Sequence, residues 1–207
     1  VGAINFASQN LTNVNIDNCH INNNYGNGIY INESNVSIAY CHLNNNGGAG
    51  VEIDSGPEVN SNVTIDNCTI NYNNTNNQSN NQIGNGVNYL DSGGDSGLLT
   101  ITNTEISNNY YFGENYNSSS AVGCNDCQLS LNNVIISNNS SAGISDTYNA
   151  TINNSTITEN LGSGLKTFSN GFINNTTISY NKLGGFGNNI YNATFENLLI
   201  DGNGSTE

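Results

Sequence analysis

The chain has 207 residues, of which 9% are charged and 35% hydrophobic, and its 16 acidic residues against two lysines give a formal net charge of −14. Because no basic stripe is present to neutralise phosphates, the composition excludes nucleic-acid binding, and an anionic membrane surface would repel the chain. No apolar run is long enough for membrane insertion, Val1 is expected to be a mature end, and residues 1–207 are expected to form one domain.

The first predicted elements are three short strands at residues 14–16, 19–21 and 28–31. In each of them, alternate apolar side chains point to the same side, as in a β-strand. Asn18 stands between the first two strands, where a sharp bend favours a residue that tolerates left-handed backbone angles. The next corner, residues 22–27, is rich in Asn and Gly for the same steric reason. Three strands and three corners predict one triangular coil.

This pattern occurs eight times along the chain, at intervals of 21 residues in its shortest form. The apolar position of the first strand is Ile16, Ile38, Ile65, Ile101, Leu131, Ile152, Ile173 and Phe195. Two residues later Asn occurs seven times and Tyr once, and five residues later there is always Ile or Leu. Eight residues later there is always Asn: Asn24, Asn46, Asn73, Asn109, Asn139, Asn160, Asn181 and Asn203. Such a repeat predicts a solenoid whose coils stack, with Asn amides bonded along the stack.

The motif V-x-I-x-N-x-x-I-x-x-N-x-x-G-G-I-x-I is present from Val36 to Ile53 and, with an insertion, from Val63 to Tyr89. It resembles the right-handed parallel β-helix repeat shared by pectate lyases, polygalacturonases, phage tailspikes and many surface adhesins. The resemblance covers nearly the whole chain and implies an all-β, single-stranded right-handed parallel β-helix of about eight coils. This fold is found in enzymes and in scaffolds, so the resemblance does not decide the activity.

Two insertions lengthen the central coils, at residues 71–83 and 108–120. Function on a solenoid usually lies where such insertions are. The second insertion contains four aromatic residues: Tyr110, Tyr111, Phe112 and Tyr116. If exposed, these rings could bind a sugar or a neighbouring subunit. The alternative is that they cover the base of their own loop.

The five cysteines form two groups. Cys19, Cys41 and Cys68 occupy one inward column in consecutive coils, where either disulfide bridging or a row of free thiols is compatible with the spacing. An unbridged row, or one bridge with one free cysteine, is favoured. Cys124 and Cys127 lie in a CNDC segment expected near an exposed corner. A local disulfide is favoured there over a redox pair or half of a zinc site, and an intermolecular bridge stays open.

Two groups of side chains suggest metal ligands. His20 and His42 are expected to be stacked on the outer face, where a solvated pair is favoured over a metal site. Acidic residues gather after the third strand of several coils: Glu33, Asp54, Glu58, Asp91, Asp95, Asp126 and Asp146. The segment 91–97, DSGGDSG, is the best candidate for a structural Ca²⁺ site, with Asp91 and Asp95 as ligands. The alternative is a solvated negative ridge, and no other cofactor is expected.

N-glycosylation sequons are dense and suggest a glycosylated extracellular surface. The candidates are Asn10, Asn35, Asn62, Asn117, Asn149, Asn192 and Asn203. The sequons at Asn67, Asn154 and Asn175 fall in a corner column, where a structural role is favoured. A chain this rich in Asn, Ser and Thr also contains such triplets by chance.

The resemblance implies what an enzyme would need. Lyase members use an Arg or Lys beside acidic Ca²⁺ ligands, and hydrolase members use clustered Asp with basic residues that hold the substrate. This chain has no Arg, and neither Lys166 nor Lys182 has an evident carboxylate cluster. A polysaccharide lyase or hydrolase using Glu52, Asp54 or Lys166 is therefore the weakest interpretation, and a non-catalytic protein is expected.

The chain opens at residues 2–6 with what reads as a third strand and closes at 195–203 with a first and second strand. Neither end shows a capping helix, so the two ends complement each other and another copy could continue the stack. We therefore expect an extracellular structural protein that self-assembles, head to tail or laterally, into a fibre, sheath or surface layer. The alternative is a cell-surface adhesin that binds glycans through the loop 108–120.

Overall fold

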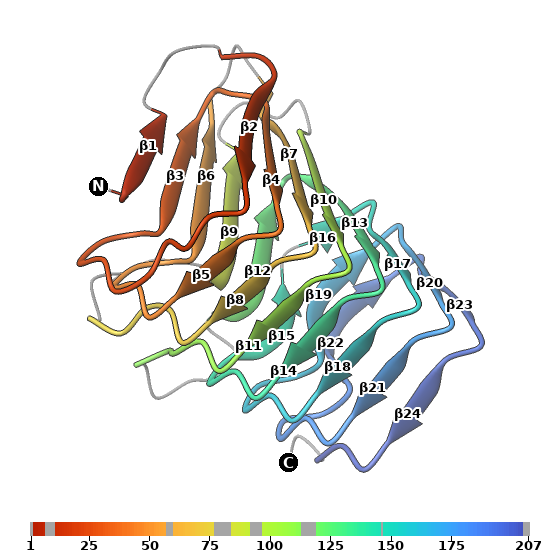
Figure 1. Cartoon of the computed structure of the whole chain (residues 1–207). Coiled ribbons are helices and arrows are strands. Elements are labelled where there is room, and N and C mark those ends of the chain that lie inside the picture. Colours follow the sequence, from red (N-terminus) through yellow and green to blue (C-terminus); the bar gives the residue numbers. More distant parts are fainter. Residues whose placement is uncertain are drawn as a thin grey trace.

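The computed structural model describes residues 2–6, 11–56, 60–76, 84–91, 97–112, 119–145 and 147–204. All regular elements in these ranges are strands, and every strand pair is parallel. The strands form three sheets that run along a single elongated coil (Figure 1). No helix in the described ranges is long and apolar enough to cross a membrane.

The first sheet collects the first strand of each coil. Its members in order are β2 (Val14–Asp17), β4 (Val36–Ala39), β7 (Asn62–Asp66), β10 (Leu98–Thr102), β13 (Gln128–Asn132), β17 (Thr151–Asn153), β20 (Phe172–Asn174) and β23 (Thr194–Glu196). The second sheet collects the second strands. Its members are β5 (His42–Asn44), β8 (Thr69–Asn71), β11 (Glu105–Ser107), β14 (Ile135–Ser137), β18 (Thr156–Thr158), β21 (Thr177–Ser179) and β24 (Leu199–Asp201), and a bridge between His20 and His42 adds the first coil.

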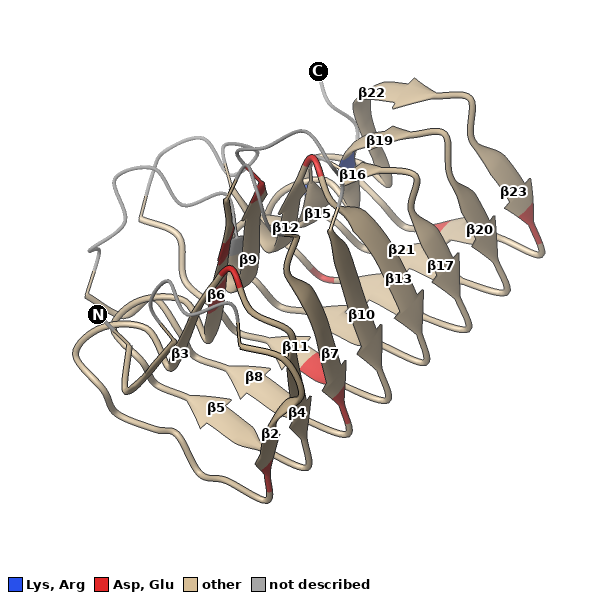
Figure 2. Ribbon diagram, turned by 90° about the horizontal axis from the view of Figure 1, so that it is seen from above, with Lys and Arg blue, Asp and Glu red and all other residues tan. Residues whose placement is uncertain are grey.

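The third sheet collects the third strands. It contains β1 (Ile4–Phe6), β3 (Ile29–Asn32), β6 (Val51–Ser55), β9 (Gly84–Asp91), β12 (Ser120–Asn125), β15 (Ala142–Ser145) and β19 (Leu165–Ser169), and both β16 (Thr147–Tyr148) and β22 (Phe186–Tyr191) pair with β19. The three sheets surround one hydrophobic core, and their strands follow one another along the coil in the view from above (Figure 2).

The register of the sheets follows the sequence repeat. Ile16 pairs with Ile38, Ile38 with Ile65, and the chain of pairs continues to Ile173 and Phe195. Inward residues of covered coils are buried completely, while their neighbours in the strand face outward. Because a shift by one residue would move each apolar side chain to the outer face, the alternating pattern fixes this register.

Left-handed residues form the corners between the first and second sheets. The eight residues of this column have φ between 47° and 58°: Asn18, Tyr40, Asn67, Asn103, Asn133, Asn154, Asn175 and Asn197. A second left-handed column ends the second strand of each coil, in the corner whose Asn and Gly content had predicted such backbone angles. It contains Asn23, Asn45, Tyr72, Asn108, Asn138, Glu159, Tyr180 and Gly202. Asn holds seven of the eight positions in the first column and four of the eight in the second, because it tolerates this backbone region better than most residues with a side chain.

Candidate functional site

An internal ladder of asparagines joins all eight coils. In each step, the backbone N–H and Nδ2 of one Asn donate to Oδ1 of the Asn in the next coil, at 2.8–3.2 Å. From the second coil on, Nδ2 also donates to a backbone carbonyl of the preceding coil, as Asn109 does to Ile70 at 2.9 Å. Both Nδ2 protons are therefore used, and the predicted amide ladder is confirmed.

The ladder has a direction, so its two ends differ. Within the described ranges no donor reaches Oδ1 of Asn24 in the first coil, and the backbone N–H of Asn203 in the last coil has no acceptor. The last coil also exposes inward positions. Phe195 is 40% exposed and Ile200 47%, whereas Ile173 and Ile178 in the coil before are fully buried. One end therefore lacks a donor for Asn24, and the other presents a donor together with apolar side chains.

The column of Cys19, Cys41 and Cys68 is an unbridged row of thiols. Sγ of Cys68 lies 3.4 Å from the backbone N–H of Cys41, which donates to it, and 3.2 Å from the carbonyl of Asp66. Further along the column, Thr104 and Ser155 make the same two contacts with their hydroxyl groups. The cysteines therefore act as hydrogen-bonding corner residues. Burial raises the pKa of the Cys68 thiol to about 11, so the thiol stays protonated at neutral pH.

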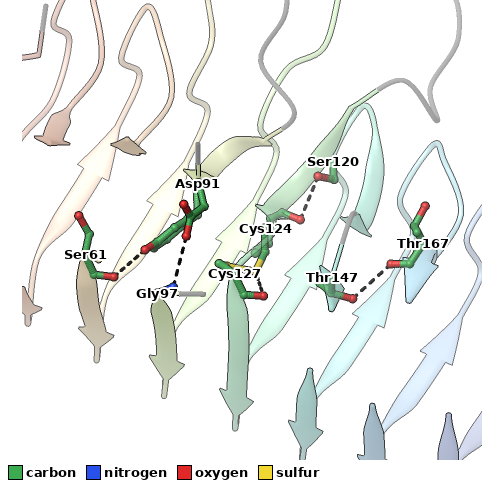
Figure 3. The surroundings of a disulfide bond; sticks show 10 residues. Ser61, Asp91, Gly97, Ser120, Cys124, Cys127, Thr147 and Thr167 are labelled. Atoms are coloured by element: carbon green, nitrogen blue, oxygen red, sulfur yellow. Dashed lines mark hydrogen bonds between the residues drawn. A yellow bond between two sulfur atoms is a disulfide. The ribbon is translucent and has the colours of Figure 1, made fainter. Parts of the chain in front are cut away.

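Cys124 and Cys127 form a disulfide between β12 and β13, with Cα atoms 5.3 Å apart (Figure 3). The corner itself is exposed at Asp126, as expected, but both cysteines are fully buried, and Cys124 is an inward residue that pairs in register with Tyr89. The ring of Tyr89 fills the same column, and its hydroxyl donates to the carbonyl of Ser61 at 2.6 Å. The disulfide therefore links two buried positions of the hydrophobic core.

The calcium candidate is only partly described, because Asp95 lies outside the described residues. Asp91 is 6% exposed, and its Oδ2 accepts a hydrogen bond from Gly97 N at 3.4 Å (Figure 3). Asp91 is thus turned into the corner and does not belong to a solvated ridge. Within the described ranges, no three His, Cys, Asp or Glu side chains converge as metal ligands. Calcium binding stays a prediction. Of the other acidic residues in this group, Glu58 and Asp146 are also outside the described ranges.

His20 and His42 stack on the outer face, with ring centroids 4.7 Å apart and planes 22° apart. Nδ1 of His42 lies 2.7 Å from Oγ1 of Thr69, so this nitrogen is already engaged. The pair is therefore a surface contact between the first two coils.

The carboxylates weighed for catalysis lie on the outer face of the third sheet. Glu52 accepts a short hydrogen bond from Nδ2 of Asn27, and Asp54 accepts one from the Tyr30 hydroxyl at 3.2 Å. Burial and these two carboxylates raise the pKa of Tyr30. Lys166 lies in β19, several coils away from both carboxylates. The structure does not bring the three candidate residues together, and acidic residues are spread along the coil (Figure 2).

Parts of both insertions are outside the described residues, including Tyr116, Asn117 and residues 77–83. The bases of the insertions are structural: Asn73 and Asn109 belong to the ladder, and Ser120 is a buried residue of β12. Tyr110 and Phe112 are 41% and 50% exposed, with ring centroids 6.4 Å apart. These two rings form an exposed pair beside the coil.

The sequons fall into distinct environments. Asn203 is the last ladder residue, and its Nδ2 donates to the carbonyls of Ile178 and Asp201. Asn62, Asn149 and Asn192 are exposed at corners that lead into the first sheet. The sequence pattern alone did not separate these two settings, because it does not show which amides are already bonded. Asn10 and Asn117 lie outside the described residues.

Comparison with known proteins supports the fold. Residues 2–96 match the family model described as a right handed beta helix region. No curated protein and no solved structure matches the chain. The three sheets that begin within the matched residues continue without a change of pairing direction to β23, β24 and β22. The chain is a right-handed parallel β-helix.

Proposed function

We propose that the protein is an extracellular, non-catalytic structural protein whose coils stack end to end with those of other copies into a fibre, sheath or surface layer. The observation that carries this proposal is the polarity of the asparagine ladder. Among the described residues, Oδ1 of Asn24 accepts no hydrogen bond and the N–H of Asn203 donates none, and these two groups lie at opposite ends. A second copy that stacks in register would supply each group with its partner.

Apolar burial supports the same contact. Phe195 and Ile200 occupy positions that are fully buried in covered coils, so a further coil would remove their side chains from water. Removing such apolar surface from water contributes about 25 cal/mol for each Å² covered, and this contribution opposes the translational and rotational freedom lost on association. Unpaired strand edges on the last coil add backbone hydrogen bonds to this contact.

Size-exclusion chromatography with light scattering, followed by negative-stain microscopy, tests the proposal. We expect polymers for the natural protein and monomers for Ile200→Asp, because the charge would be buried in the contact between coils. Ile135→Asp is the matched control: Ile135 is 49% exposed but faces outward in the middle of the second sheet. A natural protein that stays monomeric at high concentration would refute stacking. Loss of polymers in the Ile135 variant alone would indicate lateral contacts instead.

A second candidate function is glycan binding by an adhesin, and the exposed pair of Tyr110 and Phe112 favours it. Aromatic faces stack on the apolar faces of sugars, and neighbouring rings can hold adjacent units. Binding on a glycan array that is lost in Tyr110→Ala and Phe112→Ala, but kept in the exposed control Tyr148→Ala, would support this function. If neither Tyr110→Ala nor Phe112→Ala changes binding, glycan binding by this aromatic pair is refuted.

A further inference from the structure

One column of residues marks the edge where each coil enters the first sheet. Its members in register are Asn13, Asn35, Asn62, Leu98, Gln128, Asn149, Asn170 and Asn192. Four of the eight begin an N-x-S/T sequon, although they are as far as 157 residues apart in sequence (192 − 35). The fold thus gathers distant sequons onto one edge, named here the sequon edge.

The sequons reach this edge in two backbone settings. Asn62 begins β7, so strand alternation places Asn62 and Thr64 on the same outer face of the first sheet. Asn149 and Asn192 are exposed corner residues with φ of 57° and 49°, and their threonines begin β17 and β23. Thr64 and Thr194 are exposed, and Thr151 is half-buried. Near the first coils, Asn35, Ser37, Asn62 and Thr64 line an open depression of about 260 Å³. At this edge the amide of Asn62 and the hydroxyl of Thr64 therefore lie beside a depression that can hold a first sugar.

The amides of the edge also differ from those of the ladder. The side chains of Asn62 and Asn149 make no hydrogen bond within the described residues, and Asn192 uses one Nδ2 proton in a bond to Asn170. An N-linked glycan replaces one Nδ2 proton, so all three can accept it without losing a contact. Ladder residues such as Asn139 are buried and use both protons.

We propose that Asn62, Asn149 and Asn192 carry N-linked oligosaccharides, which line the sequon edge. The transfer joins Nδ2 to the anomeric carbon of an oligosaccharide carried on a lipid diphosphate. The bond between that carbon and the phosphate oxygen breaks, the lipid diphosphate leaves with the electron pair, and one amide proton passes to a base of the transferase. The inference rests on the extracellular location in the proposed function.

The spacing of the coils excludes Asn35 on a chain that is glycosylated at Asn62. Adjacent coils are about 4.8 Å apart, too close for two branched sugars side by side. Of the two, Asn62 is the more exposed, and its backbone N–H donates to Oδ1 of Asn35 at 2.8 Å. Asn149 and Asn192 are two coils apart, about 10 Å, which leaves room for both glycans. Glycans at this edge would hinder lateral contacts and leave the coil ends free.

Site mapping on the protein isolated from the cells that naturally make it tests the proposal. N-glycosidase treatment in ¹⁸O water converts each occupied Asn to labelled Asp, which peptide mass spectrometry locates, and a sample without enzyme controls for spontaneous deamidation. We expect label at Asn62, Asn149 and Asn192, and none at the ladder sequons of Asn73 and Asn139. Label at none of the three edge residues, or label in the ladder, would overturn the proposal.

A matched pair of substitutions tests the same edge without touching an Asn. In the cells that make the protein, Thr151→Ala should remove one glycan from the intact mass, whereas Thr151→Ser should retain it. An unchanged mass for Thr151→Ala would contradict a glycan at Asn149. Both measurements are independent of polymer formation, so failure of this inference is distinguishable from failure of the stacking proposal.

Discussion

At the scale of single residues, the ladder asparagines are the side chains with the most hydrogen bonds at stake. Asn109→Ala would remove both bonds to its Oδ1 and both bonds from its Nδ2, leaving buried groups of Asn73 and Ile70 without these partners. Each orphaned buried polar group costs about 1–3 kcal/mol. We expect the free energy of unfolding in urea to fall by about 2–4 kcal/mol.

The control for this prediction is Asn133→Gly. Asn133 is exposed and has φ of 58°, and among the described residues its side chain makes one hydrogen bond, from Nδ2 to Oδ1 of Asn103 in the preceding coil. Glycine retains the left-handed backbone, so the loss should stay below about 1 kcal/mol. Equal losses for the two variants would mean that the ladder contributes no more than a surface corner.

Two buried titratable residues predict a loss of stability at alkaline pH. Burial raises the pKa of Cys68 to about 11 and that of Tyr89 to about 12, from ordinary values of 9.0 and 10.0. Between pH 9 and 11 the unfolded chain has lost the Cys68 proton and the folded chain has kept it. The folded state therefore binds more protons, and stability falls as pH rises through this window and, for Tyr89, up to about 12.

Urea unfolding at a series of pH values measures this effect. Cys68→Ser keeps the column's hydrogen bonds, since Ser155 makes the same contacts, but it removes the titrating thiol. The decline between about pH 9 and 10, below the range of Tyr89, should therefore be shallower in this variant. A slope equal to that of the natural protein would show that Cys68 does not carry the effect.

At the scale of elements, glycines allow the third strand to approach the second sheet of the next coil. A Cβ at Gly164 would lie 2.5 Å from Cγ2 of Ile178 and 2.8 Å from the carbonyl oxygen of Gly185. Gly164→Ala should therefore lower the free energy of unfolding by about 1–3 kcal/mol through overpacking. One coil further on, a Cβ at Gly185 would meet Cγ2 of Ile200, in the uncovered last coil, only at 3.1 Å. Gly185→Ala should cost clearly less, and a larger loss there would contradict this account.

The sequence predicts the strands, their register and their corners where these depend on the alternation of apolar residues. The pairing of Ile16 with Ile38 and the left-handed angle of Asn18 follow from side-chain period and corner sterics. The burial of Cys124 was not predictable in the same way, because a short CNDC segment does not show which of its residues faces inward. Asn62 is an exposed sequon and Asn203 a hydrogen-bonded ladder residue. This difference likewise depends on hydrogen bonds between residues far apart in sequence.

At the scale of the whole molecule, the charge of −14 opposes any contact between copies. End-to-end stacking must therefore overcome repulsion between two acidic bodies through apolar burial and hydrogen bonds at the coil ends. Salt screens this repulsion: the Debye length falls from about 30 Å at 0.01 M to about 8 Å at 0.15 M. The inward groups at the two ends, Phe195, Ile200 and the Asn24 amide, carry no charge, whereas Glu196 and Asp201 are exposed in the strands of the last coil.

We therefore expect association to strengthen as potassium chloride rises from about 0.01 to about 0.5 M, with longer polymers in sedimentation and light scattering. Sucrose at matched osmolality is the control, because it changes water activity without screening charge. Ile200→Asp should stay monomeric across the salt series, since screening does not restore the apolar contact. Polymers that dissolve as salt rises would show instead that ion pairs hold the copies together. Phe195, Ile200 and the Asn24 amide cannot form such pairs.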